Sequence, residues 1–306
     1  MFSHWLVLPL TLIVSTAGSA QLITDKVKIV NITQVETAPV IDGVMDDEAW
    51  KSATMIEDFH QINPKEYDPP SEKSQVYVVY TKDALYVAGR FLDNEPDEII
   101  SMVLRQGDYS FGEDSFTVMI DPFNKSRSGY AFDLNTNGVR GQAVYENVTT
   151  ENWQWRGIWH GATSQDDKGW VAEIEIPFKS LSFDPHNETW GLNFARYIGR
   201  KTEHIGWVSA NRRQNPAVSG KISGMTDLEQ GFGLDIVPSV RINRAEDYLS
   251  GDTSNNAVPA IDMYYKLTPA LTAALTVNTD FSGSGVDARQ INLTRFGLFF
   301  PEQRGF

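Results

Sequence analysis

Apolar residues recur at every second position from residue 38 onward, in short runs that end at turn-forming residues such as Gly, Pro, Asn and Asp. Successive side chains of a β-strand point to opposite faces, whereas a helix would need a repeat of about 3.6 residues. The clearest runs are Val76, Val78 and Tyr80, then Phe116, Val118 and Ile120, then Trp170, Ala172, Ile174 and Ile176. The pattern excludes a mainly helical chain and predicts an all-β protein, an antiparallel β-sandwich of two packed sheets.

The alternation becomes longer and more regular beyond Gly231, where few bulky core residues remain. Strands of about ten residues with one apolar and one polar side are typical of a lipid-facing barrel, although a sandwich strand can alternate in the same way. An outer-membrane barrel needs at least about eight strands to close, and residues 231–306 offer about four. We therefore predict that residues 231–306 are the N-terminal strands of a truncated, incomplete β-barrel segment.

The first twenty residues contain an apolar stretch from Leu6 to Val14, followed by the small residues Ala17-Gly18-Ser19-Ala20. This pattern predicts a signal peptide, residues 1–20, that is cleaved after Ala20. The apolar stretch is shorter than the roughly 20 residues that a membrane-spanning helix needs. The rest of the chain is expected to be exported, to the outer membrane, the periplasm or the cell surface of a Gram-negative-type bacterium.

Charge and cysteine content exclude several classes of function. The formal net charge is -14, and this charge would repel the phosphate backbone of a nucleic acid. The absence of cysteine excludes disulfides, cysteine zinc sites, thiol nucleophiles and a lipid-modified cysteine anchor. Nucleic acid is therefore not an expected partner.

Short motifs follow one another in a fixed order between residues 38 and 228. They are Pro39-Val40-Ile41-Asp42-Gly43 with Asp46, Ala49 and Trp50; Ala84-Leu85-Tyr86-Val87; the strand from Asp114 to Asp121; and the strand from Gly169 to Pro177. This order resembles that of the family 9 carbohydrate-binding modules. The resemblance implies a non-catalytic sandwich at residues 38–228 whose partner is an oligosaccharide or polysaccharide.

A second resemblance covers the end of the chain. The segments are Val277-Asn278-Thr279-Asp280-Phe281, Arg289 to Phe296, and Phe299-Phe300-Pro301-Glu302. They look like the start of the outer-membrane barrel domain that follows such modules in a bacterial family of unknown function. The chain of that family continues past this point, so the sequence is expected to be a fragment or a truncated gene product, and the full-length form is expected to contact the outer membrane through these C-terminal strands.

Three of the eight tryptophans, Trp153, Trp155 and Trp159, lie within seven residues. In an extended segment Trp153 and Trp155 would share one face, and exposed rings bordered by polar side chains suit stacking against sugars. The alternative is that these rings fill the sandwich core, as expected for Trp50, Trp170 and Trp190. Both interpretations remain open from the sequence.

The resemblance also implies where a sugar would be held, because family members clamp it between two aromatic platforms. The first platform matches Tyr109 or Phe111, and the second matches the stretch around Arg213. An arginine there implies that the second platform is lost. The leading hypothesis is glycan capture or uptake at the cell envelope, and its rival is an interaction or plug domain that has lost sugar binding. A third hypothesis is a glycoside hydrolase, or an accessory module of one, in carbohydrate catabolism.

Catalytic residues are not predicted. Glu173 and Glu175 are spaced like a glycosidase pair, but the alternation of their strand assigns both to a solvated face. The expected cofactor content is none, apart from a structural calcium ion. Asp121, Asp133 and Asn135 concentrate oxygen ligands around one hairpin, and related modules carry calcium, but turns favour Asp and Asn without any metal.

Overall fold

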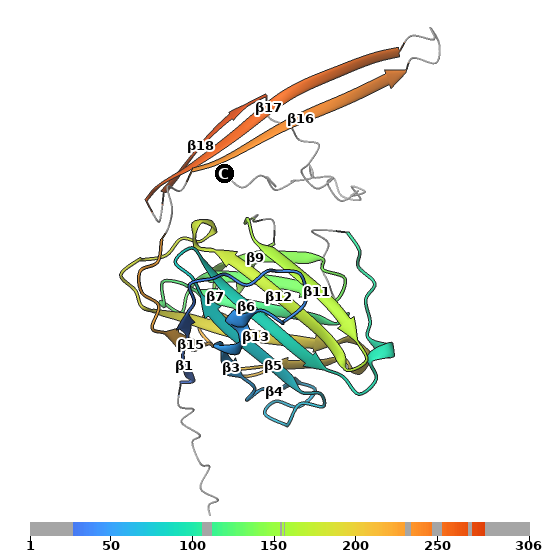
Figure 1. The fold of residues 1–306 in the computed structure, drawn as a ribbon, viewed down its shortest axis with the longest axis vertical. Helices are drawn as coiled ribbons and strands as arrows, with labels where there is room; N and C mark the ends of the chain where they lie inside the picture. Colours follow the sequence, from blue (N-terminus) through green and yellow to red (C-terminus); the bar gives the residue numbers. More distant parts are fainter. Residues whose placement is uncertain are drawn as a thin grey trace, which may run out of the picture.

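The computed structural model describes residues 27–105, 112–153, 155, 157–229, 234–246, 253–268 and 271–278. The predicted signal peptide and the motifs beyond residue 278 lie outside the described residues. Two sheets, called sheet A and sheet B below, pack against each other as a sandwich, and a third sheet is drawn above them in Figure 1. The predicted all-β fold is therefore confirmed. None of the helices in the described ranges is long and apolar enough to cross a membrane.

Sheet A has nine strands, in the order β1-β15-β13-β7-β8-β9-β10, with β14 and β4 continuing from β13. Its strands are β1 (Ile29–Asn31), β4 (His60–Asn63), β7 (Ser115–Asp121), β8 (Gly129–Asn135), β9 (Arg140–Asn147), β10 (Thr150–Asn152), β13 (Thr189–Ile198), β14 (Glu203–Gly206) and β15 (Gly220–Ser223). The pairs are antiparallel except for β1, which runs parallel to β15.

Sheet B has six strands, in the order β11-β12-β6-β5-β2, with β3 also paired to β5. Its strands are β2 (Thr33–Gln34), β3 (Thr54–Ile56), β5 (Ser74–Tyr80), β6 (Ala84–Leu92), β11 (His160–Asp166) and β12 (Gly169–Pro177). The alternating run of Val76, Val78 and Tyr80 lies on β5, which forms an antiparallel hairpin with β6. The helical elements are short: α1 (Glu48–Lys51) and the 3-10 turns η1 (Pro96–Glu98), η2 (Phe178–Ser180) and η3 (Gly199–Lys201).

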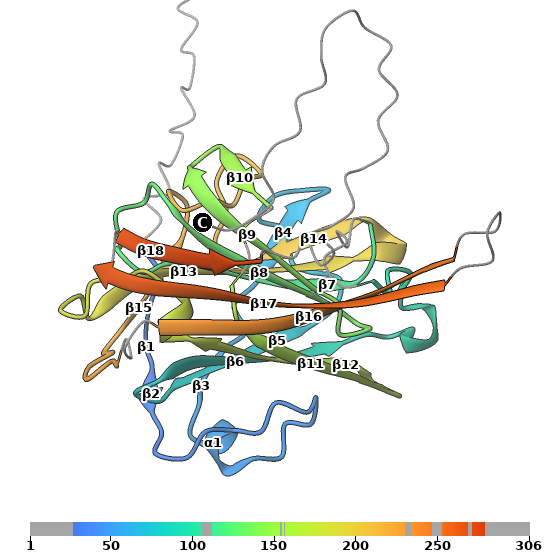
Figure 2. The same ribbon diagram turned by 90° about the horizontal axis from the view of Figure 1, so that it is seen from above.

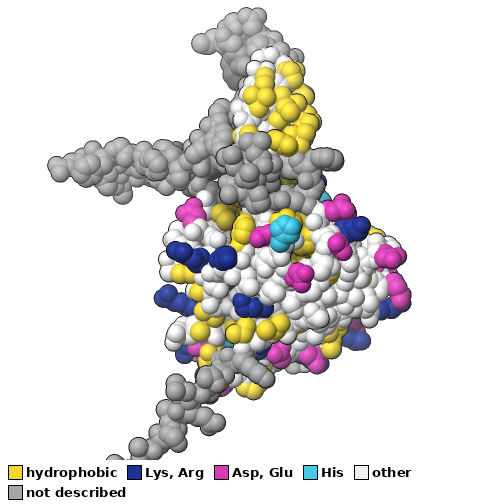
Figure 3. Space-filling model, turned by 90° about the vertical axis from the view of Figure 1, so that its left-hand side faces the viewer, with side chains coloured by type: hydrophobic (Ala, Val, Ile, Leu, Met, Phe, Trp, Pro, Cys, Tyr) yellow, Lys and Arg dark blue, Asp and Glu magenta, His cyan; other side chains and the backbone are white. Residues whose placement is uncertain are grey.

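The third sheet is an antiparallel meander of β16 (Leu234–Glu246), β17 (Thr253–Thr268) and β18 (Leu271–Val277). Its strands are long, and Leu234, Ile236, Val240 and Ile242 on β16 are all exposed. Figure 3 shows hydrophobic side chains gathered on this upper part of the molecule. The predicted regular alternation beyond residue 231 is thus present as strands, and its interpretation as part of a barrel stays a prediction.

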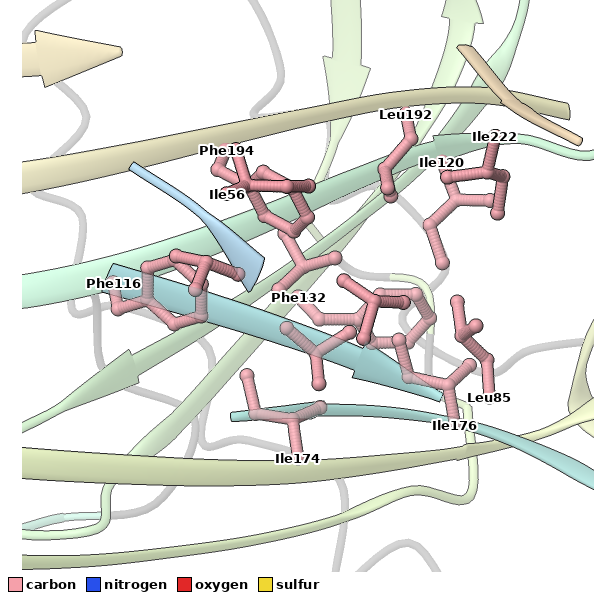
Figure 4. Close-up of a cluster of buried hydrophobic side chains, with 14 of the residues drawn as sticks. Ile56, Leu85, Phe116, Ile120, Phe132, Ile174, Ile176, Leu192, Phe194 and Ile222 are labelled. Atoms are coloured by element: carbon pink, nitrogen blue, oxygen red, sulfur yellow. The ribbon is translucent and has the colours of Figure 1, made fainter. Parts of the chain in front are cut away.

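The core lies between sheets A and B, where the alternating apolar residues of both sheets meet. Phe116 and Phe132 from sheet A face Ile174 and Ile176 from sheet B (Figure 4). Burial of such side chains removes apolar surface from water, which is the main force that stabilises a sandwich. The predicted core tryptophans Trp50, Trp170 and Trp190 are all buried.

The outer side of sheet B is partly covered by the segment that contains α1 (Figure 2). Glu173 on β12 fastens this segment: its Oε2 accepts hydrogen bonds from the backbone N–H groups of Asp42 at 3.1 Å and Gly43 at 2.7 Å. Its Oε1 accepts one from Trp50 Nε1 at 2.8 Å. The prediction that Glu173 lies on a solvated face is wrong, because residues from the N-terminal segment bury that face.

Candidate functional site

The outer face of sheet A brings together the polar and aromatic side chains that best fit a binding site. On β7, Phe116 and Val118 enter the core, so Thr117 between them points outward. The register places Thr117 opposite Asp133 on β8, and Asp133 opposite Gly141 on β9. Thr117, Asp133 and Gly141 therefore form one row across three neighbouring strands.

Trp153 lies on this outer face, over an apolar floor. The floor consists of Met119, Ala131, Ala143, Tyr145 and Ala195, against which the half-buried Trp153 packs. The indole Nε1 of Trp153 donates a hydrogen bond to Glu151 Oε2 at 3.0 Å. One side of the ring is thus supported by protein and its orientation is fixed by a carboxylate.

The Trp153 ring and the Asp133 carboxylate both lie near Gly141, at ordinary van der Waals distances. A Cβ atom built on Gly141 would lie 3.9 Å from Cζ3 of Trp153 and 3.7 Å from Oδ2 of Asp133. The other carboxylate oxygen, Oδ1, accepts a hydrogen bond from Thr117 Oγ1 at 2.7 Å. An apolar ring that is held in this way can stack on one face of a sugar, whereas the Asp133 carboxylate is buried and supports the surface from below.

A comparison with protein families identifies what this sandwich is, since the family described as carbohydrate family 9 binding domain-like matches residues 41–223. The chain belongs to this family. The family expected from the order of the sequence motifs is thereby confirmed. No curated protein matches the chain.

Solved structures of similar fold include a family 9 carbohydrate-binding module from Caldicellulosiruptor kristjanssonii in complex with cellotriose. Its sequence is 20% identical to this chain, and the TM-score is 0.46. The match covers 65% of this chain and 96% of that module. A putative carbohydrate-binding protein from Bacteroides uniformis is 13% identical with a TM-score of 0.51, over 65% of this chain and 99% of that one. The second likeness supports the fold of this family 9 sandwich.

Trp155 and Trp159 do not share the outer face with Trp153. The Trp155 ring packs in the core, with its centroid 5.1 Å from that of Tyr130 and 6.0 Å from that of Phe132. Trp159 is only 2% exposed, and its Nε1 donates to Gln142 Oε1 at 2.7 Å. The expectation that Trp153 and Trp155 lie on one face is wrong, and buried Trp159 offers no ring face to a ligand. The physical reason is that this segment leaves sheet A at β10 and enters sheet B at β11 instead of continuing as one strand.

The first aromatic platform, Tyr109 or Phe111, lies outside the described residues. Glu113 and Asp114, which follow it in the chain, are anchored to the family 9 sandwich by hydrogen bonds. Glu113 Oε2 accepts hydrogen bonds from the backbone N–H groups of Met102 at 2.5 Å and Val103 at 2.9 Å. Asp114 Oδ2 accepts from Ile100 at 3.1 Å. Burial raises the pKa of the Asp114 carboxyl, although the backbone donors of Ile100 and Gly199 act in the opposite direction. These two carboxylates hold residues 100–103 against the start of β7.

Arg213, at the place of the second platform, lies on an exposed turn beside β13 and β14. The turn is closed by a β-bridge between Ala210 and Arg213. Gln214 anchors it, because its Nε2 donates to the backbone oxygens of Phe194 at 2.9 Å and Val208 at 3.0 Å. This turn lies on the β13–β14 side of sheet A, whereas Trp153 lies over β8 and β9, with β7 between them. The turn and the nearest surroundings of Trp153 at Gly141 thus lie over different strands of sheet A.

The three oxygen ligands proposed for calcium are not brought together. Asn135 pairs with Ser115 at one end of β7, and Asp121 lies six residues further along that strand, which corresponds to about 20 Å. Asn135 Oδ1 already accepts hydrogen bonds from the backbone N–H groups of Asn137 at 3.0 Å and Val139 at 2.8 Å. Asp133 binds Thr117 instead. Among the residues that the structure describes, no cluster of three or more His, Cys, Asp or Glu side chains could hold a metal ion.

Thr117 and Gly141 are site residues that the sequence analysis missed. The signal for Gly141 was available, because the Asn137-Gly138 turn sets the pairing of β8 with β9 and so places Gly141 opposite Asp133. Thr117 could be recognised only once β7 was paired with β8. Neither residue type is unusual enough to attract attention without this register.

Proposed function

We propose that the family 9 sandwich binds carbohydrate without catalysis, on the outer face of sheet A around Trp153 and Asp133. The observation that carries the proposal is the half-buried Trp153 ring, which lies over the outer face of sheet A with its Nε1 bonded to Glu151. Family membership supports it. The role of Trp153 is to stack on a sugar ring, while the buried Asp133, bonded to Thr117, supports the surface beside the ring.

The test is calorimetric titration of the full chain, in a mild detergent, with soluble oligosaccharides beginning with cellotriose. Loss of a stacking ring costs roughly 1–3 kcal/mol of binding free energy, so Trp153→Ala should weaken binding roughly 5- to 150-fold. The matched control is Ile158→Ala, an exposed neighbour on the same segment, which should bind like the wild type. Unchanged affinity in Trp153→Ala would contradict the proposed site.

The rival function, an interaction or plug domain, is favoured by one observation: an exposed arginine stands where the family has its second aromatic platform. Absence of binding by the wild-type chain across a broad oligosaccharide panel would favour this rival. The glycosidase alternative is not proposed further, because the family consists of binding modules. Buried Glu173 is moreover engaged by three N–H donors and unsuited to act with Glu175.

We further propose that β16, β17 and β18 form the membrane-facing beginning of an outer-membrane barrel. The register places apolar residues opposite one another on one side of the meander: Leu234 opposite Tyr265, Ile236 opposite Met263, and Val240 opposite Pro259, with Met263 also opposite Leu275. The alternate positions are mixed: Ser239, Arg241, Asp262 and Thr276 occupy them together with Val237, Val258 and Tyr264. A mainly apolar side next to a more polar one is what a strand between lipid and water requires.

The length of the apolar side fits this proposal. From Leu234 to Ile242 the strand rises roughly 27 Å, and a tilt of about 40° reduces its height to about 21 Å, near the apolar band of about 25 Å of known barrels. Beyond Ile242 the sequence turns polar on both paired strands, at residues 243–246 and 253–256. The proposed location of the exported protein is therefore the outer membrane, with the sandwich beside the barrel strands. The same proposal includes the domain limits expected from the sequence: a signal peptide at residues 1–20, the sandwich at residues 38–228 and the barrel strands at residues 231–306.

A further inference from the structure

A groove crosses the outer face of sheet B, on the side of the sandwich away from Trp153. Residues near α1 cover one part of this face, where Trp50 packs on Val79, Ala84, Tyr86 and Ala88. The neighbouring part remains open as the sheet B groove. Its lining consists of Gly43, Val44, Met45, Asp46, Trp50, Lys51, Tyr77, Arg90, Ser164, Asp166 and Val171.

The floor of the sheet B groove is a row of side chains from adjacent strands. Arg90 on β6 is opposite Val171 on β12, and Val171 is opposite Ser164 on β11. Tyr77 on β5 lies in the neighbouring row and packs in part against the cluster around Trp50. The hydrogen bonds of Glu173 to Gly43 and Trp50 hold the wall formed by residues 43–51 in place. The floor and the wall are therefore built on well-anchored backbone.

Charges in the sheet B groove are balanced. The lining carries two cations, Arg90 and Lys51, and two carboxylates, Asp166 and Asp46. The Arg90 guanidinium donates to Asp166 Oδ1 at 2.8 Å, and Lys51 pairs with Glu48. An ionised ligand would gain no net attraction there and would lose part of its hydration, so an uncharged ligand fits the groove better.

The strands beneath the groove leave no backbone groups for an extended peptide. β6 is paired with β5 and β12, and β12 is paired with β6 and β11, so both edges of each strand are occupied. Peptide recognition by strand addition requires an open edge. Recognition in the groove must therefore come from side chains, mainly the Tyr77 ring, the apolar Met45 and the planar Arg90 guanidinium. The Ser164 hydroxyl donates to Gly43 O at 2.6 Å and so can only accept a further hydrogen bond.

We propose that the sheet B groove is a second carbohydrate-binding site, which takes an uncharged oligosaccharide on the opposite face of the sandwich from Trp153. A flat ring with apolar neighbours and paired polar groups offers stacking together with hydrogen bonds to hydroxyl groups. The two sites face in opposite directions, so one molecule can hold two glycan chains. This second site does not depend on binding at Trp153.

The test uses the full chain in mild detergent and calorimetric titration with the neutral trisaccharides cellotriose and mannotriose. Arg90→Met keeps the apolar stem of the side chain but removes its donors, and Tyr77→Ala removes the ring. With either trisaccharide, Trp153→Ala is expected to retain residual binding, and adding Arg90→Met or Tyr77→Ala should weaken that residual binding at least tenfold. Lys82→Met, which removes an exposed cation away from the groove, is the matched control and should leave the residual binding unchanged. Melting curves of each variant check that the fold is retained.

Two results would overturn the second site: loss of all binding in Trp153→Ala alone, or residual binding that Arg90→Met and Tyr77→Ala leave unaltered. Failure of the first site gives a different result, because Trp153→Ala would then bind like the wild type while Arg90→Met would still weaken binding. A mannuronate trisaccharide serves as the charged comparison. It should bind the Trp153→Ala chain at least tenfold more weakly than mannotriose does, and equal binding would contradict the charge argument.

Discussion

At the scale of single residues, Glu173 explains why the entry motif of the chain has its particular sequence. Its carboxylate satisfies three N–H donors of residues more than a hundred positions earlier in the chain. Gly43 has a φ of +90°, and a Cβ there would lie 2.9 Å from the backbone carbon of Thr163, so only glycine fits this approach. The alternation of β12 correctly assigns Glu173 to the outer side of the sheet. It could not predict burial, because the cover comes from a distant segment.

Glu173→Ala should lower the free energy of unfolding by about 2–4 kcal/mol, because it leaves buried N–H donors without an acceptor. Chemical denaturation of the wild type and the variant measures this difference. The control is Glu175→Ala on the same strand, whose side chain is 27% exposed, and which should cost less than about 1 kcal/mol. Equal losses in both variants would contradict the role given to Glu173.

The pH dependence of stability gives a second prediction at this residue. Burial raises the pKa of Glu173 in the folded state, despite the opposing hydrogen bonds from Gly43, Trp50 and Asp42. Since the folded protein holds this proton more tightly than the unfolded chain, the contribution of Glu173 to stability should fall as pH rises from about 4.5 through the raised pKa. Chemical denaturation across this pH range should show that the free energy of unfolding declines in the wild type, and that Glu173→Gln lacks this decline. The same pH dependence of the free energy in both proteins would contradict the raised pKa.

At the scale of elements, the strands could be predicted from the sequence but the candidate site could not. Runs such as Val76 to Tyr80 alternate over enough residues to identify β5, β7 and β12 directly. Trp153 and Trp155 lie in the connection between β10 of sheet A and β11 of sheet B, outside both strands. Alternation holds only within a continuous strand, so it fails from Trp153 to Trp155.

The meander of β16 to β18 gives a prediction at the same scale. Ile236→Lys places a charge on the apolar side and should reduce flotation of the full chain with phosphatidylcholine vesicles, because a lysine near the bilayer midplane costs about 2–4 kcal/mol. Ser239→Lys, on the alternate side of the same strand, should float like the wild type. Equal effects of the two lysines would show that the apolar side does not contact lipid.

At the scale of the whole molecule, the buried clusters of the sandwich all lie between Ile32 and Met225. Residues 21–230 should therefore fold alone and unfold in one cooperative transition, because their core needs no side chain from the third sheet. Residues 231–306 alone should aggregate in water through unpaired strand edges and the apolar side of the meander. Circular dichroism and size-exclusion chromatography of the two pieces measure both outcomes. A soluble, folded 231–306 piece would contradict this division.

The parallel pairing of β1 with β15 has a mechanical consequence for the sandwich. The pairs Ile29 with Lys221, Val30 with Ile222 and Asn31 with Ser223 join its first and last strands side by side. Tension applied between the beginning of β1 and the end of β15 acts along the strand axes, so all of these hydrogen bonds are loaded in shear at the same time. The sandwich should therefore resist being pulled open from the two places where the chain enters and leaves it.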